Sequence, residues 1–398
     1  MKKILLVLVA LCSLALGSCS SDSDNNNSEM SNRWNIDEVT QTLYDNDTEG
    51  IDVTVRLALT PSEDVILEPV ITCSDDEIKE MVDLPLMVVI PAGQKSATFK
   101  VSANMLNSIK KSGTVTLGFK ECEGITAGTP VTFNVVPVGG DVEELTAEQN
   151  VLIETWKAAG FDAKKYLGVH KVCSVVYFND NDKDSYNGGN SAIEYNSFIT
   201  FNISPNATND DIAFVMKSNA LGLQSFLYKM YKMNTVEDEE YWLSNVHNAD
   251  LLKAVNYNAD KETFNASLEI HFNLDGTIRF TDDEYTLPNG DTMTGVPFKF
   301  EYSAWERQQS LSSYIIDNGD AGKEEITMTD AIEQGITLNP NSVFPTSDIS
   351  YDAWDGGETS LYVAPKASYD DSTIKFVFPW DFMNAYGYEK IAVTINIK

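Results

Sequence analysis

Hydrophobic and polar residues alternate in short runs over the first third of the chain. The alternation is clean in residues 51–59 (IDVTVRLAL), and it returns in residues 113–119 (GTVTLGF) and 129–137 (TPVTFNVVP). A period of two is typical of strands that bury one face. Because several such runs follow one another within about 100 residues, separated by turns, they predict an antiparallel β-sandwich over residues 37–137.

The periodicity changes after residues 138–144 (VGGDVEE), which we expect to form a hinge because glycines interrupt strand pairing. Thr146 is placed to cap a helix, and Gln149, three residues later, completes a capping box. The apolar stripe that follows includes Trp156, and Gly160 is a typical stop signal. The pattern therefore predicts a helix that opens a second domain.

Beyond this helix most of the chain is again strand-like. The segment FNLDGTIRF carries Asp275 and Gly276 between two alternating runs, which is a strong hairpin signal. Residues 210–256 fit a helix or a pair of strands equally well, apart from a short helix expected at residues 248–255. We therefore predict a mainly β protein, in which residues 145–398 form a larger β-rich α+β domain.

The start of the chain has a different hydrophobic pattern. Two lysines precede an apolar run that is too short to span a bilayer and that fits a signal peptide. The run ends in LGSC, which resembles the bacterial lipobox, where the peptide is cut before the cysteine and the thiol receives a diacylglyceryl group. We expect a signal peptide over residues 1–18 and a lipid on Cys19. An ordinary secretory signal with an incidental cysteine is the alternative.

Residues 19–36 are predicted to be a flexible tether, because their Ser, Asp and Asn side chains favour solvated chain. Asp22 and Asp24 resemble the acidic export signal of Bacteroidetes surface lipoproteins. We therefore expect the protein to be anchored in the outer membrane and exposed on the cell surface, with periplasmic retention as the alternative.

Composition limits the classes of partner. The chain has 60 acidic and 28 basic side chains among 398 residues, which gives a formal net charge of −32. Such a charge repels nucleic acid, so we expect no DNA or RNA partner. The hydrophobic fraction of 43% is sufficient for packed cores.

The cysteines leave two interpretations open. Cys73 and Cys122 fall in the predicted sandwich, and they could form a disulfide in an oxidising compartment or remain as two buried thiols. No CxxC motif and no cysteine–histidine cluster is present, which argues against a structural zinc site.

Two longer segments carry a family resemblance. The helix region LTAEQNVLIETWKAAGFDAKKYLGVHKV, together with FNLDGTIRF, resembles a family of two-domain Bacteroidetes surface lipoproteins of unknown function. The segment IPAGQKSATFKV resembles a phrase found in their immunoglobulin-like modules. The resemblance covers most of the chain after residue 18 and implies an immunoglobulin-like sandwich and an outer-membrane lipoprotein linked to glycan uptake. It implies no catalytic residue.

One acidic segment suggests a cation site. In NDNDKDSYNGGN, residues 179–190, Asp180, Asp182 and Asp184 alternate as carboxylates do in calcium loops. The match is partial, because Ser185 stands where an EF-hand-like loop has glycine. A solvated acidic turn is the alternative. Calcium is therefore the one cofactor that we consider.

Another segment has the composition of a sugar-binding loop. Aromatic rings pack on the C–H face of a sugar, and carboxylates bind its hydroxyls. The segment SYDAWDGGETSLY, residues 350–362, combines both kinds of side chain around a Gly-Gly turn. The alternative is that each tryptophan packs under its own loop. The candidate ligand-binding residues are Tyr351, Asp352, Trp354, Asp355, Glu358 and, from a second segment, Trp305.

Catalytic motifs are lacking. The sequence has no G-x-S-x-G, H-E-x-x-H or Walker motif, and its three histidines are isolated along the chain. We therefore predict a lipid-anchored cell-surface binding protein that contacts a polysaccharide or another extracellular ligand, and not an enzyme. A structural or assembly lipoprotein with a protein partner is the first alternative. A glycoside hydrolase, which needs only two carboxylates at the right separation, is the second.

Overall fold

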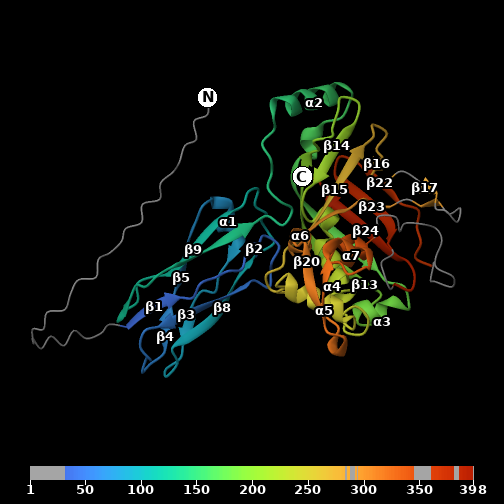
Figure 1. Ribbon diagram of the computed structural model, residues 1–398. Helices are drawn as coiled ribbons and strands as arrows, with labels where there is room; N and C mark the ends of the chain where they lie inside the picture. The colour runs from blue at the N-terminus through green and yellow to red at the C-terminus, as the bar shows by residue number, and fades with distance from the viewer. Residues whose placement is uncertain are drawn as a thin grey trace, which may run out of the picture.

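The computed structural model describes residues 32–282, 285–286, 292–293, 295–344, 360–380 and 385–397. Figure 1 shows two bodies joined by one linker, a smaller one drawn in blue to green and a larger one drawn in green to red. Both are built mainly of antiparallel sheets, and the larger body also contains several helices. The predicted fold class is confirmed.

The smaller body is a two-sheet sandwich. Its elements are β1 (Asn32–Ile36), β2 (Leu43–Tyr44), β3 (Ile51–Leu57), β4 (Val65–Leu67), β5 (Pro69–Cys73), α1 (Asp76–Met81), β6 (Val82–Asp83), β7 (Val88–Ile90), β8 (Ser96–Ala103), β9 (Gly113–Phe119), β10 (Ile125–Thr126) and β11 (Val131–Val136). One sheet has the order β10–β1–β3–β8–β6 and the other β2–β11–β9–β5. With β1, β3, β8 and β6 as strands A, B, E and D, and β5, β9 and β11 as C, F and G, this is the constant-type immunoglobulin arrangement.

The sandwich begins earlier than the alternation predicts. Strand β1 lies within the segment assigned to the tether, and it pairs with β3 over Trp34 to Ile36. Trp34 is buried, and its ring meets that of Phe119 edge-on at 5.4 Å. Only two large side chains of β1 point inward, so the hydrophobic signal is too short to stand out in a polar stretch. The tether prediction is therefore wrong from Asn32 onward.

The predicted hinge is a packed linker. The Val138 amide donates to Oδ1 of Asp45 (2.8 Å), and the Thr200 hydroxyl donates to the Gly140 carbonyl (2.9 Å). Gly139 lies so close to the larger body that a Cβ there would stand 2.6 Å from the Thr200 backbone nitrogen. The linker is thus fixed to both bodies, and only glycine fits its closest approach.

Asp45 is the buried anchor of this linker. Its carboxylate also accepts a hydrogen bond from the Ile109 amide (3.3 Å). Burial raises its pKa from 3.8 to about 6, although the two backbone N–H donors act in the opposite direction.

The larger body begins with the predicted helix. Its elements are α2 (Ala147–Ala158), η1 (Ala163–Lys165), β12 (Gly168–Tyr177), α3 (Asp182–Asn187), β13 (Ala192–Ile203), β14 (Ile212–Met216), η2 (Ala220–Gly222), α4 (Gln224–Met233), α5 (Val246–Ala254), β15 (Phe264–Phe272), β16 (Ile278–Arg279), β17 (Tyr285–Thr286), β18 (Thr292–Met293), β19 (Lys299–Tyr302), α6 (Ser303–Ser310), β20 (Ser313–Asp317), η3 (Gly319–Ala321), β21 (Lys323–Thr327), α7 (Met328–Glu333), η4 (Pro340–Ser342), β22 (Lys366–Tyr369), β23 (Thr373–Trp380) and β24 (Glu389–Asn396). The capping box of Thr146 and Gln149 forms as predicted. No helix in the described parts of the chain is long and apolar enough to cross a membrane.

One nine-stranded sheet organises the larger body. Its order is β16–β15–β14–β13–β12–β24–β23–β22, and β19 also pairs with β15. The predicted hairpin is confirmed, because β15 and β16 pair antiparallel around Gly276. Residues 210–256, which fitted either element, contain one strand and the helices α4 and α5.

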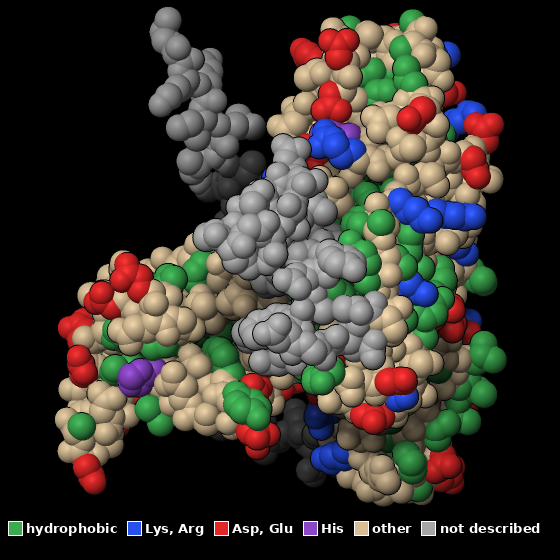
Figure 2. Space-filling model, turned by 90° about the vertical axis from the view of Figure 1, so that its right-hand side faces the viewer, with side chains coloured by type: hydrophobic (Ala, Val, Ile, Leu, Met, Phe, Trp, Pro, Cys, Tyr) green, Lys and Arg blue, Asp and Glu red, His purple; other side chains and the backbone are tan. Residues whose placement is uncertain are grey.

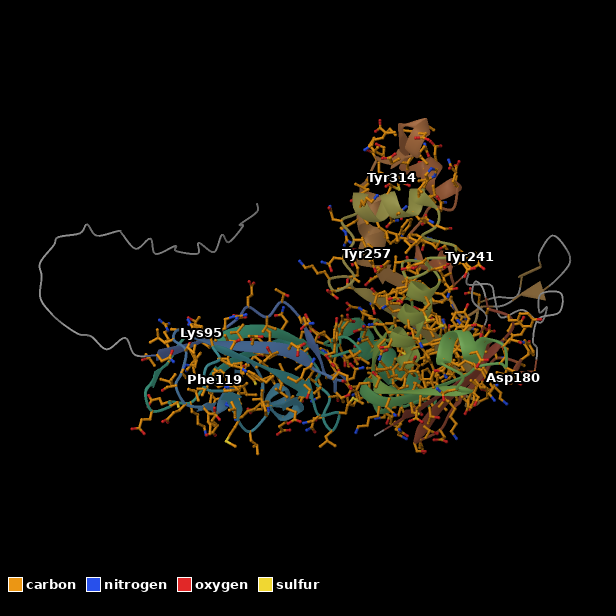
Figure 3. All side chains as sticks on the ribbon, turned by 90° about the horizontal axis from the view of Figure 1, so that it is seen from below. Lys95, Phe119, Asp180, Tyr241, Tyr257 and Tyr314 are labelled. Carbon is orange, nitrogen blue, oxygen red and sulfur yellow. The ribbon has the colours of Figure 1, made fainter. Side chains whose placement is uncertain are left out.

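The sheet has one packed face and one open face. Its inner face and α4 share a single hydrophobic core, to which Phe376, Val393 and Leu227 belong, and Figure 3 shows helices stacked on one side of the sheet. Positions facing the other way, such as Lys375 and Thr394, are exposed or half-buried. This open face meets the linker and the sandwich along β13.

Candidate functional site

A cleft of about 620 Å³ lies where the sandwich, the linker and the larger domain meet. Ligand sites occur preferentially at such domain junctions. The lining residues are Glu77, Glu80, Leu106, Asn107, Ser108, Lys110, Val142, Glu143, Leu145, Gln149, Leu167, Gly168, Val169, Lys171, Phe198, Phe201, Asn202 and Ile203.

Helix α1 and the loop after β8 form the sandwich wall. Asp75 caps α1 and fixes its first turn, from which Glu77 reaches the Lys110 side chain as an ion pair. In the loop, Met105 has a positive φ of 55°, a backbone conformation that costs a non-glycine residue about 1 kcal/mol or more. The next residue, Leu106, is 75% exposed at the edge of the cleft.

Strands β12 and β13 supply the opposite wall. Lys171 and Phe198 are register partners. The Lys171 ammonium lies 5.9 Å from the centroid of the Phe198 ring and 3.5 Å from the Met105 carbonyl oxygen. This lysine therefore bridges the two bodies at the side of the cleft.

The linker closes the third side. The Glu143 amide donates to Oδ1 of Asn202 (3.0 Å), and the Asn202 side-chain amide donates to the Asp141 carbonyl (3.2 Å). The Glu143 carboxylate forms an ion pair with Lys217. Because these contacts hold the linker to β13, the cleft is preformed and a ligand pays little to order it.

The chemistry of the cleft is mixed. Leucine, valine and phenylalanine side chains form apolar surface, and amide and charged groups surround it. Two of its three carboxylates, Glu77 and Glu143, are in ion pairs, and the Glu80 side chain has no ion-pair partner among the described residues. This combination suits a ligand that carries both C–H faces and hydroxyl groups.

The sugar-binding candidates from the sequence lie elsewhere. Tyr351, Asp352, Trp354, Asp355 and Glu358 are outside the described residues, as is Cys19.

Trp305 is described, and it belongs to α6, where it is half-buried against the core of the larger domain. Trp305 does not line the cleft. Its packing agrees with the alternative considered for each tryptophan, that it supports its own segment.

The three candidate calcium ligands do not converge. Asp180 is exposed and forms an ion pair with Lys183 (2.6 Å), whereas Asp182 is buried and accepts from the Tyr386 amide. Residues 182–187 form helix α3 in place of an open loop, because Asn179 accepts from the backbone amides that follow it and turns the chain. Figure 3 shows Asp180 on the side of the larger domain away from the sandwich.

The rest of the described chain offers no better cation site. No group of three or more His, Cys, Asp or Glu residues in it is arranged to hold a metal ion. Calcium is therefore not part of the function proposed below.

The structure shows the state of the two cysteines of the sandwich. Cys73 and Cys122 are free, half-buried thiols, so the disulfide alternative is wrong. Burial raises the pKa of Cys73.

One histidine that is isolated in the sequence has charged neighbours in space. His271 places Nδ1 2.8 Å from Oδ1 of Asp211 and Nε2 3.4 Å from Oε1 of Glu269. His271 and Glu269 belong to β15 and Asp211 to the turn before β14, and their spacing along the chain gives no local motif.

Residues 143–396 match the model of one family, described as Domain of unknown function (DUF8472), and the chain belongs to that family. No curated protein matches the chain.

Three solved structures are similar at low identity. A crystal structure of CBD12 from CALX1.2 is 12% identical, covering 46% of this chain and 79% of that one, with a TM-score of 0.23. A protein of unknown function from Bacteroides ovatus is 11% identical over 92% of this chain and 93% of its own, with a TM-score of 0.22. A multidomain protein including DUF1735, also from Bacteroides ovatus, is 11% identical over 92% and 94%, with a TM-score of 0.19.

Proposed function

We propose that this member of the DUF8472 family is a lipid-anchored binding protein of the bacterial cell surface. In this proposal Cys19 carries the lipid in the outer membrane, and the cleft binds a polysaccharide or another extracellular ligand. The cleft itself is the observation that carries the proposal, because it is preformed, lies at a domain junction and combines apolar walls with polar groups.

The state of the carboxylates favours binding over hydrolysis. A glycoside hydrolase needs two carboxylates free to act on one bond. In the cleft, Lys110 neutralises Glu77 and Lys217 neutralises Glu143, which leaves Glu80 as the acid without an ion-pair partner in the described ranges. Such a carboxylate and the neighbouring amides are well suited to accept and donate hydrogen bonds to sugar hydroxyls.

Affinity electrophoresis with a panel of plant and host glycans tests the proposal. Leu106→Trp places a bulky ring at the edge of the cleft from an exposed position, so we expect it to weaken retardation by roughly tenfold while the fold stays intact. Leu86→Trp is the matched control, since Leu86 is 87% exposed on the same domain and does not line the cleft. If the folded protein is retarded by none of the glycans, the proposal fails.

A second candidate function has its own observation. Ile66 and Val89 are register partners on β4 and β7, yet they are 52% and 44% exposed, and Met87 beside them is 60% exposed. Such an apolar strand surface suits a protein partner, as expected for an assembly lipoprotein. Ile66→Asp would then abolish capture of a partner from outer membranes, and unchanged capture would count against this function.

A further inference from the structure

The open face of the large sheet continues past the cleft. From Lys171 on β12 it crosses β24 and β23 to β22, where a shallow hollow of about 470 Å³ lies. The register joins the strands into one row, since Cys173 pairs with Thr394, Thr394 with Lys375, and Lys375 with Ser368. The residues between the lysines are small or uncharged, so no bulky side chain interrupts the surface along the row.

Along β12, β24, β23 and β22 the charge of this face is opposite to that of the whole protein, whereas Glu194 of the adjacent β13 points to the same side and hydrogen-bonds with Cys173. The outward positions on β12, β24, β23 and β22 carry four lysines and no carboxylate: Lys171, Lys390, Lys375 and Lys366. None of the four forms an ion pair with any residue in the described part of the chain, although the protein has 60 acidic side chains. Figure 2 shows Lys and Arg side chains among hydrophobic and acidic ones toward the right-hand border of the larger domain.

Lys390 shows how the surface is organised. Its ammonium lies 4.3 Å from the centroid of the Tyr177 ring, which holds the side chain over its neighbour on β12. Lys366 and Lys375 occupy diagonal positions on adjacent strands, where neighbouring residues are about 7–8 Å apart. The amines are therefore spread along the sheet rather than gathered at one point.

We call the surface that carries Lys171, Lys390, Lys375 and Lys366 the lysine face. We propose that it binds an anionic polysaccharide, whose carboxylate or sulfate groups pair with the lysine amines. The inference rests on the proposed function and names the class of ligand. An extended chain fits a long, shallow surface with separated positive charges, and lysine ammonium groups bind such anions without fixed geometry. Lys171 belongs to both surfaces, so a polymer on the lysine face continues into the cleft.

Nucleic acid is the less favoured polyanion. Duplex DNA carries a charge every 1.7 Å or so, and the net charge of −32 repels it more than a polymer with one charge per sugar or fewer.

Charge reversal tests the assignment. The double variant Lys366→Glu/Lys375→Glu should weaken affinity for polygalacturonate and chondroitin sulfate by roughly tenfold or more, since each change replaces attraction by repulsion. The control Lys95→Glu/Lys157→Glu makes the same change in net charge at two exposed lysines off this face, one in the sandwich and one in α2, and it should bind like the wild type. Neutral dextran should not retard the protein through the lysine face.

A thiol footprint locates the contact. Cys173 lies at the β12 end of the row and is half-buried, whereas Cys73 and Cys122 belong to the sandwich. Saturating polygalacturonate should slow alkylation of Cys173 and leave the other two thiols unchanged. The proposal is overturned if polygalacturonate leaves the alkylation rate of Cys173 unchanged, or if both double variants lose affinity equally. It is also overturned if the protein binds neither polyanion, or if duplex DNA retards it as strongly as polygalacturonate does.

The two proposals fail separately. If the lysine variant binds a panel glycan normally and Leu106→Trp does not, the cleft proposal stands and the lysine face is refuted. If the lysine variant loses polygalacturonate and Leu106→Trp has no effect on any glycan, the lysine face stands and the cleft is refuted.

Discussion

Replacing Asp45 by asparagine should change how the stability of the sandwich depends on pH. The carboxylate is fully buried, has no ion-pair partner among the residues that the structure describes, and accepts hydrogen bonds from the Val138 and Ile109 amides. Because burial raises its pKa from 3.8 to about 6, the folded state holds the proton more tightly than the unfolded state does. Its contribution to stability is therefore fully present below about pH 4 and is lost as the pH rises through 6.

The magnitude follows from the shift. Two pKa units are worth about 3 kcal/mol over the whole titration, of which about 1.4 kcal/mol falls between about pH 5 and pH 7.5. The asparagine side chain of the variant stays neutral at both pH values, and it loses one of the two acceptor contacts at a cost of about 1 kcal/mol that does not depend on pH. We therefore expect Asp45→Asn to gain about 1.4 kcal/mol relative to the wild type on going from about pH 5 to pH 7.5.

Hydrogen exchange of the β9 and β11 amides measures this difference inside the sandwich. Comparing wild type and variant at the same pH cancels the intrinsic pH dependence of exchange, so the ratio of the wild-type rate to the variant rate should rise roughly tenfold between about pH 5 and pH 7.5. Asp52→Asn, which removes a 62% exposed carboxylate of the same domain, is the control for loss of one charge. A ratio for Asp45→Asn that is equal at both pH values would refute the argument.

Three further changes have defined outcomes. In thermal unfolding, Gly139→Ala should destabilise the contact between the linker and β13 by about 1–3 kcal/mol, because its Cβ would stand 2.6 Å from the Thr200 nitrogen. The control Gly118→Ala, whose Cβ would make ordinary contacts at 3.6 Å, should lower the stability less in the same assay. Thr146→Ala should speed hydrogen exchange in α2 by an amount equivalent to about 1 kcal/mol, through loss of the cap. Cys19→Ser should move the protein from the membrane fraction to the soluble fraction, and unchanged fractionation would contradict lipid anchoring.

The sequence predicts those elements whose signals are local. The capping box at Thr146 and the turn at Gly276 depend on residues within a few positions, and both form as expected. The long alternating strands are also clear, because a buried face leaves a period of two. Strand β1 is missed since only Trp34 and Ile36 mark it, and residues 179–190 are misjudged because a turn at Asn179 starts a helix in a segment rich in acids.

The candidate site is beyond the reach of these signals. Its walls come from α1, the loop after β8, the linker, β12 and β13, which lie far apart along the chain. Phe198 illustrates the problem, because in the sequence it is one apolar residue in a strand, and only docking of the sandwich makes it part of a cleft. The lysine face is equally invisible, since each lysine is an ordinary outward residue until the strand order places four of them on one surface.

The point at which the chain enters the sandwich determines how the cleft and the lysine face lie relative to the proposed anchor. Strand β8 begins beside Leu57, at the end where β1 starts, and ends at Ala103, whose amide binds the Asp47 carbonyl near the linker. Its eight residues span roughly 25 Å. In Figure 1 the chain accordingly enters the sandwich at the end away from the larger domain. A lipid on Cys19, as proposed, would therefore attach on the side of the sandwich away from the cleft. The cleft and the lysine face, which both involve the larger domain, would then lie away from the anchored end and open to a polymer outside the cell.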